Sequence, residues 1–372
     1  MPKENSSELL YQIGLTMLPN IGSILAKNLL AYCGSAEGVF KASKQKLMKI
    51  PAIGEERADS IVNSTVLEEA AKELKFINEF KIQCLFFTDD AYSRRLKQIA
   101  DSPLLLYYKG NADLNAEKIV GIVGTRKATE YGKEATRKLV ADLAAHDVLV
   151  ISGLAYGIDV AAHSAALENN LKTVGVLGHG LNMIYPTQHT AIAKKMVAQG
   201  GLLTEYKSVD EVLQHNFPER NRIVAGMCDA VVVVESAIKG GAVLTANIAN
   251  SYNREVFAFP GRSIDKTSAG CNFLIKTFKA GFIENAHDLL EAMHWHKQEE
   301  TVKSKGKQKQ LAIALSDDEQ KIYNLLNETP EVEIDKLADT TGINASQLAA
   351  TLLELEMNNV IVSLPGKRYK LI

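Results

Sequence analysis

Short apolar runs alternate with amphipathic stretches between residue 80 and about residue 290. The runs are rich in Val and Ile and lie at 118–123, 147–151, 172–177, 229–234 and 255–259. Amphipathic stretches separate them, for example at 132–145, 156–169 and 242–253. Continuous apolar runs of this length indicate strands buried on both faces. Their alternation with helices predicts a parallel sheet that is covered by helices on each side.

A helical region precedes this sheet and contains a near-repeat. Leu18-Pro19-Asn20-Ile21-Gly22 returns 32 residues later as Ile50-Pro51-Ala52-Ile53-Gly54. The pair resembles a tandem helix-hairpin-helix, in which the backbone N–H groups of a turn can hold a phosphate. In the first copy, Gly22 and Lys27 suit a phosphate as well as they suit a purely structural turn. In the second copy, Glu55 and Glu56 would repel one.

A polar, lysine-rich segment at 297–310 predicts a flexible linker. After it, Ser316 precedes three acidic residues, which is typical of a helix N-terminus. The remaining pattern of three helices and a hairpin predicts a small winged-helix domain. The chain therefore divides into a helical domain at 1–78, a sheet domain at 79–296, the linker, and a winged-helix domain at 311–372.

The charge of the last domain argues against duplex DNA as its ligand. Residues 311–372 hold ten acidic and five basic residues. The helix expected from Ala345 to about Met357 carries Glu354 and Glu356 and no Lys or Arg. Because neutralised phosphates dominate DNA affinity, this pattern favours a protein-interaction or regulatory module.

The composition of the whole chain excludes several classes of protein. With 42 Lys+Arg and 44 Asp+Glu the formal net charge is -2, which excludes a histone-like polycation. No apolar run reaches the roughly 18 residues of a membrane span, and the polar start Met-Pro-Lys-Glu-Asn predicts no signal peptide. The four cysteines form no C-x-x-C, which favours reduced thiols in a cytoplasmic protein.

Glycine-rich or hydroxyl-bearing loops follow the predicted strands at the edge where parallel sheets bind ligands. Such loops can direct backbone N–H groups at an anion. They are Gly124-Thr125-Arg126, Ser152-Gly153, Gly178 to Asn182, and Lys239-Gly240-Gly241. Arg220, Asn221 and Arg222 add two guanidinium groups and an amide at the start of a probable helix. Together these loops predict a groove for consecutive phosphates, with the amide suited to a base edge.

The same loops lack the motifs of common cofactor and catalytic sites. Arg126 and Glu130 stand where a dinucleotide fingerprint needs its later glycines, and no P-loop is present. Asp159 and His163 share a helix face, but further metal ligands are missing, so a helix-start carboxylate and a packed histidine are expected. Ser152 lacks the G-x-S-x-G elbow of a nucleophile. The sequence predicts no cofactor, no metal and no catalytic residue.

Ordered motifs from about residue 80 to 290 resemble the DprA (DNA-processing protein A, or Smf) family. The motifs are GIVGTR (121–126), SGLAYGIDVAAH (152–163), GVLGHGLNMIYP (175–186), TEY (204–206), FPERNRIVAG (217–226), GGAVLTA (240–246) and FPG (259–261). The segment from Asp101 to Tyr107 also fits, on the entry side. Some relatives place a Lys shortly after the Tyr-Pro; here Tyr185-Pro186 is followed by Thr187, and Lys194 or Lys195 would have to supply that charge.

This resemblance implies an extended Rossmann-like domain between a helix-hairpin-helix (SAM-like) domain and a winged-helix domain. It implies single-stranded DNA binding without enzymatic turnover, a homodimer formed through the Rossmann-like domain, and loading of the recombinase RecA during natural transformation. The DNA contacts that it implies are Gly124, Thr125, Arg126, Ser152, Gly153, Arg220, Asn221, Arg222, Lys239, Gly240 and Gly241.

A nucleotide-binding enzyme, such as a nucleotide phosphoribohydrolase of related Rossmann type, is the alternative. Glu235 and the run Gly240 to Thr245 faintly resemble the P-G-G-x-G-T-x-x-E motif of those enzymes. The Pro and the trailing Glu of that motif are missing. Release of a free base from a nucleoside monophosphate would distinguish this activity from DNA binding.

Overall fold

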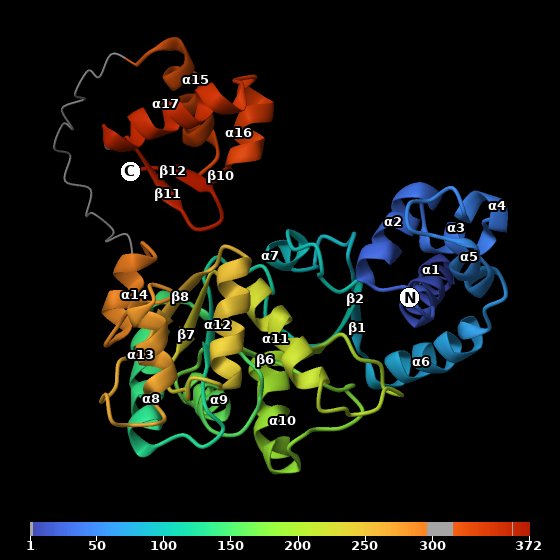
Figure 1. Ribbon diagram of the computed structural model, residues 1–372, viewed down its shortest axis with the longest axis horizontal. Coiled ribbons are helices and arrows are strands. Elements are labelled where there is room, and N and C mark those ends of the chain that lie inside the picture. Colours follow the sequence, from blue (N-terminus) through green and yellow to red (C-terminus); the bar gives the residue numbers. More distant parts are fainter. Residues whose placement is uncertain (1–2, 296–314, 359) are drawn as a thin grey trace.

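The computed structural model describes residues 3–295, 315–358 and 360–372 of the chain, so the predicted linker at 297–310 lies outside the described residues. A helical domain, a large sheet domain and a small C-terminal domain follow one another (Figure 1). In the part of the chain that is described, no helix is both long and apolar enough to cross a membrane.

The N-terminal domain consists of helices. They are α1 (Lys3–Met17), α2 (Ser23–Cys33), α3 (Ala36–Lys41), α4 (Lys44–Leu47), α5 (Glu55–Val62) and α6 (Val66–Phe80). Gly22 and Gly54 of the near-repeat are the N-caps of α2 and α5. The Lys27 ammonium, the candidate phosphate ligand of the first copy, instead donates to Ser102 Oγ at 2.6 Å and to the Ala100 carbonyl at 3.1 Å. Burial lowers the pKa of Lys27, against the opposing effect of Asp101. This copy therefore holds the helical domain against the sheet domain.

The central domain contains a mixed sheet of nine strands in the order β1-β2-β6-β5-β4-β3-β7-β8-β9. The strands are β1 (Gln83–Phe86), β2 (Leu105–Gly110), β3 (Ile119–Val123), β4 (Leu149–Ser152), β5 (Thr173–Val176), β6 (Gly200–Thr204), β7 (Ala230–Val233), β8 (Glu255–Ala258) and β9 (Gly281–Phe282). The seven strands β6, β5, β4, β3, β7, β8 and β9 pair in parallel with their neighbours. At one edge, β2 pairs antiparallel with β6, and β1 pairs antiparallel with β2. The predicted parallel sheet is thus confirmed, and the antiparallel strands are an addition to it.

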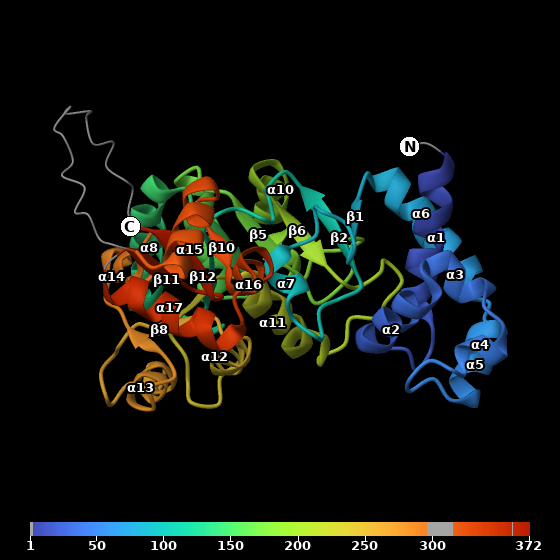
Figure 2. The same ribbon diagram turned by 90° about the horizontal axis from the view of Figure 1, so that it is seen from above.

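Helices cover both faces of this sheet (Figures 1 and 2). The helices of the domain are α7 (Arg94–Lys97), α8 (Glu130–Leu143), α9 (Ile158–Glu168), α10 (Thr190–Gln199), α11 (Asn216–Met227), α12 (Gly241–Ser251), α13 (Ala269–Lys276) and α14 (Ala286–Ala292), with 3-10 turns at Ala144–His146 and Thr187–His189. Residues of α8, α9 and α14 pack on one face, and residues of α11, α12 and α13 pack on the other.

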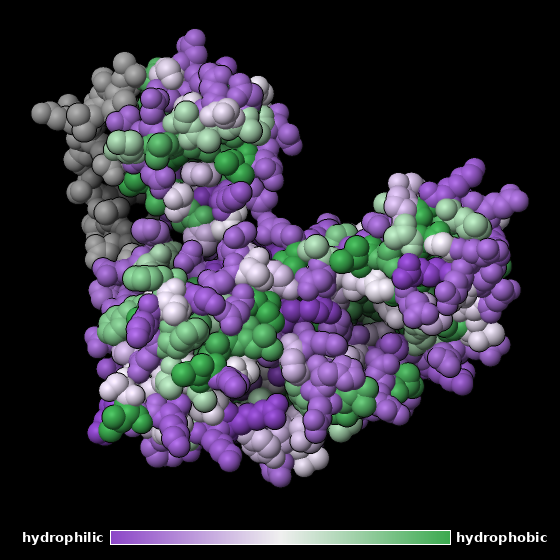
Figure 3. Space-filling view, viewed as in Figure 1, coloured by the Kyte–Doolittle hydropathy of each residue, from purple (hydrophilic) through white to green (hydrophobic). Residues whose placement is uncertain are grey.

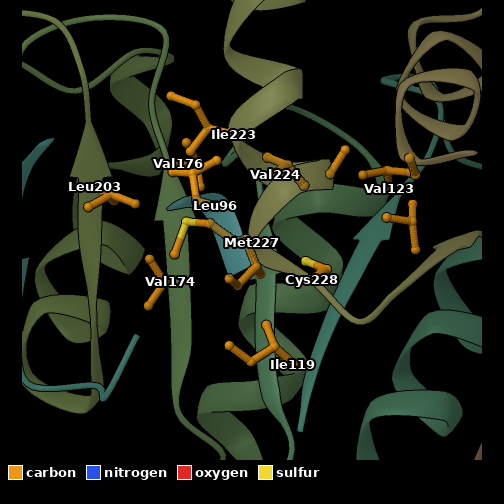
Figure 4. Packing of buried hydrophobic residues seen from close by; sticks show 14 of the residues in the cluster. Leu96, Ile119, Val123, Val174, Val176, Leu203, Ile223, Val224, Met227 and Cys228 are labelled. Atoms are coloured by element: carbon orange, nitrogen blue, oxygen red, sulfur yellow. The ribbon is translucent and has the colours of Figure 1, made fainter. Parts of the chain in front are cut away.

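Alternate residues of β3 enter the two cores. Ile119 and Val123 belong to one core and Val120 and Ile122 to the other, and all four are nearly inaccessible to solvent. Figure 4 shows the first core, in which Met227 and its neighbours on α11 lie against the central strands. A strand buried on both faces has to be apolar at every position, which explains the unbroken runs in the sequence.

The C-terminal domain has the winged-helix order of elements. It contains α15 (Asp317–Glu328), β10 (Val332–Glu333), α16 (Ile334–Thr341), α17 (Ala345–Met357), β11 (Ile361–Leu364) and β12 (Arg368–Leu371). Ser316 caps α15 in a reciprocal capping box with Glu319, as the acidic start predicted. Leu348, Leu352 and Leu355 of α17 are buried in the domain's own core.

The hairpin β11–β12 faces the sheet domain. Arg368 lies 3.7 Å from the Asp229 carboxylate, and the Gln98 amide donates to the Glu333 carboxylate at 3.2 Å. Asp229 precedes β7, so the C-terminal domain contacts the amino-terminal edge of the sheet. In this structure the wing therefore contacts the sheet domain of its own chain.

Candidate nucleic-acid interface

A pocket of about 350 Å³ lies at the carboxyl ends of β3 and β7. β4 pairs with one edge of β3 and β7 pairs with the other, so the strand order reverses between β3 and β7. Open parallel sheets bind ligands at this kind of reversal. The lining includes Gly124, Thr125, Arg126, Ala155, Asp159, Phe217, Arg220, Asn221, Gly240 and Gly241. Of the predicted contacts, Ser152, Gly153, Arg222 and Lys239 are not part of this lining.

The loop after β3 positions Arg126 at the rim of the pocket. A Cβ on Gly124 would lie 2.7 Å from Cβ of Ile158, so only glycine fits between this loop and α9. The Thr125 N–H donates to the Glu235 carbonyl at 2.7 Å. Arg126 is exposed, and its guanidinium carbon lies 5.8 Å from the centre of the Phe217 ring. The ring attracts a cation held over its face, which helps to position the Arg126 side chain.

Ser152 at the end of β4 and Gly153 after it make room for Arg220 rather than lining the pocket, although Ala155 of the same loop is part of the lining. The buried Ser152 hydroxyl donates to the Ile122 carbonyl at 2.6 Å, and the Gly153 N–H donates to the Asp159 carboxylate at 3.1 Å. A Cβ on Gly153 would overlap the Arg220 guanidinium. These contacts give Ser152 and Gly153 a positioning role in the structure.

Arg220 is a buried cation in the wall of the pocket, with a side chain only 4% exposed. Its Nη1 donates to the Val176 carbonyl, whereas its Nε has no hydrogen-bond partner among the described residues. Burial lowers the pKa of Arg220, and the nearby Asp159 carboxylate opposes that shift. Burial likewise raises the pKa of Asp159, against Arg220. The two groups compensate one another, and the free Nε leaves capacity for a further acceptor.

Helix α12 supplies a second anion-friendly feature. It begins after Gly240, and within the described residues no side chain caps it and its first turn holds no acid. A helix N-terminus carries partial positive charge and free N–H groups. Gly241 is exposed, and nothing lies within 4 Å of a Cβ placed there. Lys239 lies just outside the pocket in the exposed turn before this helix.

Arg222 points away from the pocket. Its Nη1 donates to the Asp101 carbonyl at 2.7 Å, and its Nη2 is paired with the Glu205 carboxylate. The side-chain carboxylate of Asp101 accepts a hydrogen bond of 2.8 Å from the Tyr252 hydroxyl. Arg222 thus joins α11 to neighbouring elements, while Asn221, the residue before it on the helix, lines the pocket.

Phe217 is a pocket residue that the sequence prediction did not assign. The Arg126 guanidinium lies over the Phe217 ring, and the centre of that ring is 5.7 Å from the ring centre of Tyr185. Residues 217, 220 and 221 lie three and four positions apart, which is the spacing of one helix face. This spacing in the sequence could have indicated that Phe217 lies on the same helix face as Arg220 and Asn221. On the face shown in Figure 3, hydrophobic residues also gather over α12, where Leu244 is 44% exposed.

The groups considered for metal or enzyme chemistry have structural partners. The buried His163 shares a 2.7 Å hydrogen bond with Thr173 Oγ1, and within the described residues no group of three or more His, Cys, Asp or Glu is arranged to hold a metal. The buried Glu235 carboxylate accepts from the N–H of Thr129 at 2.9 Å and from its hydroxyl at 2.6 Å, at the start of α8. Glu235 is therefore turned away from the pocket.

Three family models match the chain in the order of its domains. The model described as DNA recombination-mediator protein A matches residues 83–294, the DprA winged helix domain matches 306–367, and a SAM-like helix-hairpin-helix tandem matches 13–65. The predicted architecture of a Rossmann-like domain between these two domains is thereby confirmed.

Relatives and solved structures agree with this match. Protein Smf of Synechocystis is 31% identical and covers 98% of this chain and 99% of its own length. The X-ray structure of DNA processing protein A from Streptococcus pneumoniae is similar with a TM-score of 0.67 and 30% identity, over 76% of this chain and 97% of that one. A Helicobacter pylori DprA structure, whose published description concerns its single-stranded DNA binding mode, has a TM-score of 0.53 and 28% identity, over 58% of this chain and 96% of that one. The chain therefore belongs to the DNA recombination-mediator protein A family, the family of DprA and Smf.

Proposed function

We propose that this protein binds single-stranded DNA in the pocket at the ends of β3 and β7 and loads RecA onto it, without catalytic turnover, during natural transformation. The observation that carries the proposal is Arg220, a buried guanidinium with an unpartnered Nε in the pocket wall. Buried charged groups normally have their hydrogen bonds satisfied. A phosphate oxygen or a base carbonyl in the pocket would complete this one.

The remaining pocket residues support the same ligand. Arg126 and Lys239 are exposed cations suited to phosphates, and the start of α12 at Gly240 and Gly241 offers N–H groups to another. Phe217 offers an aromatic ring to a base, and a stacked base is bound with little regard to sequence. The mixture of cations and an aromatic ring is typical of sites for single strands.

Substitution of the rim cations tests the site. In Arg126→Ala and Lys239→Ala, we expect retention of oligo-dT in a gel shift to be lost, and the residual binding to depend less steeply on salt, by about 0.7 in the log–log slope per phosphate contact. Lys41→Ala removes an exposed lysine that pairs with Glu37 in the N-terminal domain and serves as the control. Binding by both rim variants that matches the control would overturn the site assignment.

The preference for single strands and the loading of RecA need separate measurements. We expect single-stranded DNA to bind much more tightly than duplex, and this preference to survive deletion of 297–372. For loading, the measured quantity is ATP hydrolysis by RecA on a strand covered with single-strand binding protein. The full chain should shorten the lag, and Arg126→Ala should not. An unchanged lag with the wild-type chain would refute loading while leaving DNA binding intact.

We also propose a homodimer formed through the α13–β9 face of the Rossmann-like domain. Phe278 is 97% exposed and Phe282, on the edge strand β9, is 52% exposed. Exposed aromatic side chains beside an open sheet edge favour association with a second copy. Light scattering should show a dimer that Phe278→Glu and Phe282→Glu convert to a monomer, whereas Met357→Glu, at an exposed position of α17, should not. A wild-type monomer at micromolar concentration would exclude the dimer.

The C-terminal domain is proposed to bind protein rather than DNA. Its wing contacts the sheet domain, and α17 exposes Leu353 and Met357 beside Glu354.

A cytoplasmic location is proposed as well, since all four cysteines are free thiols.

A further inference from the structure

Two exposed tyrosines lie at the same sheet edge as the pocket but outside its lining. Tyr156 follows β4 and is 40% exposed, and Tyr185 follows β5 and is 49% exposed. In the sheet order, β4 is next to β3 and β5 is next to β4. Neighbouring strands are about 4.8 Å apart. The two tyrosines therefore continue the carboxyl edge of the sheet for roughly 10 Å beyond the strand from which Arg126 comes.

The contacts of each ring fix its position while leaving much of its surface open. Tyr185 lies 5.7 Å from Phe217 between ring centres, with an angle of 46° between their planes. The Tyr156 hydroxyl donates to the Gln188 side-chain oxygen at 2.8 Å, and its ring meets the buried His189 edge-on at 5.0 Å. Rings held in this way lose little conformational entropy when a ligand stacks on them.

Resting on the proposed function, we infer that Tyr185 and Tyr156 form a second base-stacking subsite. A single strand that fills the pocket continues over the ends of β4 and β5, where its bases stack on these two rings. Tyr185 and Phe217 are tilted relative to one another, and their centres are 5.7 Å apart. Rings at roughly 4.5–7 Å between centres are in contact with one another, so a base stacks on the outer face of Tyr185 and not between the two rings.

The inferred subsite differs from the pocket in its chemistry. The pocket presents Arg126, Arg220 and the start of α12, whereas stacking on a tyrosine releases few counterions. Loss of a stacked base contact therefore lowers affinity without changing the salt dependence. Loss of Arg126 lowers both, which separates the two kinds of contact in one titration.

The test measures binding of the full chain to dT oligonucleotides of increasing length by fluorescence anisotropy. Tyr185→Ala should weaken binding of long oligonucleotides about tenfold, the usual loss for one stacked base. Binding of the shortest oligonucleotide that still fills the pocket should stay within twofold of wild type. Tyr185→Phe should restore the long-strand affinity because it keeps the ring. Tyr32→Ala removes a tyrosine of α2 that is 56% exposed and far from the pocket, and serves as the control.

A single abasic residue moved along the strand locates the contact. With the wild-type chain, one position should lower the affinity about tenfold, and in Tyr185→Ala the same abasic position should have no further effect. The corresponding scan with Tyr156→Ala should remove the sensitivity of a second position.

The outcomes separate the two proposals. If the wild-type chain does not bind the strand, the proposed function fails. If the wild type binds and Arg126→Ala abolishes binding, but Tyr185→Ala and Tyr156→Ala match Tyr32→Ala at every length, the stacking subsite is refuted and the pocket stands. A Tyr185→Ala variant that also changes the salt slope as Arg126→Ala does would likewise refute stacking as its role.

Discussion

Asp229 joins three parts of the molecule, and its replacement by Asn should cost more stability than any surface ion pair. Asp229 is 3% exposed. Its carboxylate accepts from Arg95 Nε at 2.7 Å, from Arg95 Nη2 at 2.8 Å and from the Ile119 N–H at 2.9 Å. Asn has nearly the same shape but only one acceptor oxygen. In either orientation, its NH₂ group faces a donor in place of an acceptor.

The magnitude follows from the groups left without a partner. The Arg95 side chain is 11% exposed, so its charge would remain in a largely desolvated position without a counterion. Removal of one partner of a buried ion pair costs about 3–5 kcal/mol. For a domain of this size, each kcal/mol lowers the melting temperature by roughly 2–4 °C. Thermal unfolding followed by circular dichroism should therefore show a fall of about 10 °C in the transition of the sheet domain.

A matched control and a double mutant decide whether this reasoning is right. Glu331→Gln breaks the partly exposed pair between Glu331 and Arg368, and should cost about 1 kcal/mol or less. Arg95→Met combined with Asp229→Asn should be less destabilised than the sum of the single changes, because each removes the same pair. A melting temperature of Asp229→Asn within 2 °C of Glu331→Gln, or strict additivity, would refute the assignment.

Three further predictions concern other parts of the fold. Gly153→Ala should lower both the melting temperature and the affinity for oligo-dT, because its Cβ displaces Arg220; Gly241→Ala, with open space at its Cβ, should leave the melting temperature unchanged. Burial lowers the pKa of His163 from 6.5 to about 3, so the folded state binds fewer protons than the unfolded state between these values. The free energy of unfolding should therefore fall as the pH drops from 6.5 towards 3, and a titration of His163→Gln should show a flatter profile. Arg368→Ala removes the cation that faces Asp229, and small-angle scattering should show a larger radius of gyration for this variant. Lys321→Ala, which removes a lysine paired with Asp318 on α15, should leave the radius of gyration unchanged.

The sequence predicted those strands whose environment is apolar on both sides. The runs at 118–123 and 229–234 contain β3 and β7, and neither run extends more than one residue beyond its strand at either end. β6 was missed because it begins with Gly200 and Gly201, and glycine is disfavoured in strands. Its glycines are required by a tertiary contact, since the Tyr108 ring of β2 occupies the space of a Gly201 side chain. No local pattern contains that information.

For the residues that line the pocket, the sequence predicted the loops better than the helix. Glycine loops after strands identified the edge and the pocket, because the position of such loops follows from the topology alone. Arg220 and Arg222 are two residues apart, and composition gives no means to tell which side chain faces the pocket. The packing of α11 decides it: Arg220 enters the pocket wall, and Arg222 pairs with Glu205.

The wing of the C-terminal domain meets the sheet domain at the amino-terminal edge of the sheet (Figure 1), whereas the pocket lies at the carboxyl edge. β3, with five residues, separates the two by about 16 Å. On the proposed function, a DNA strand in the pocket and a protein bound to α17 would therefore occupy separate parts of the molecule. The chain would then bridge the two in a ternary assembly. We therefore expect the two binding events to be nearly independent in free energy.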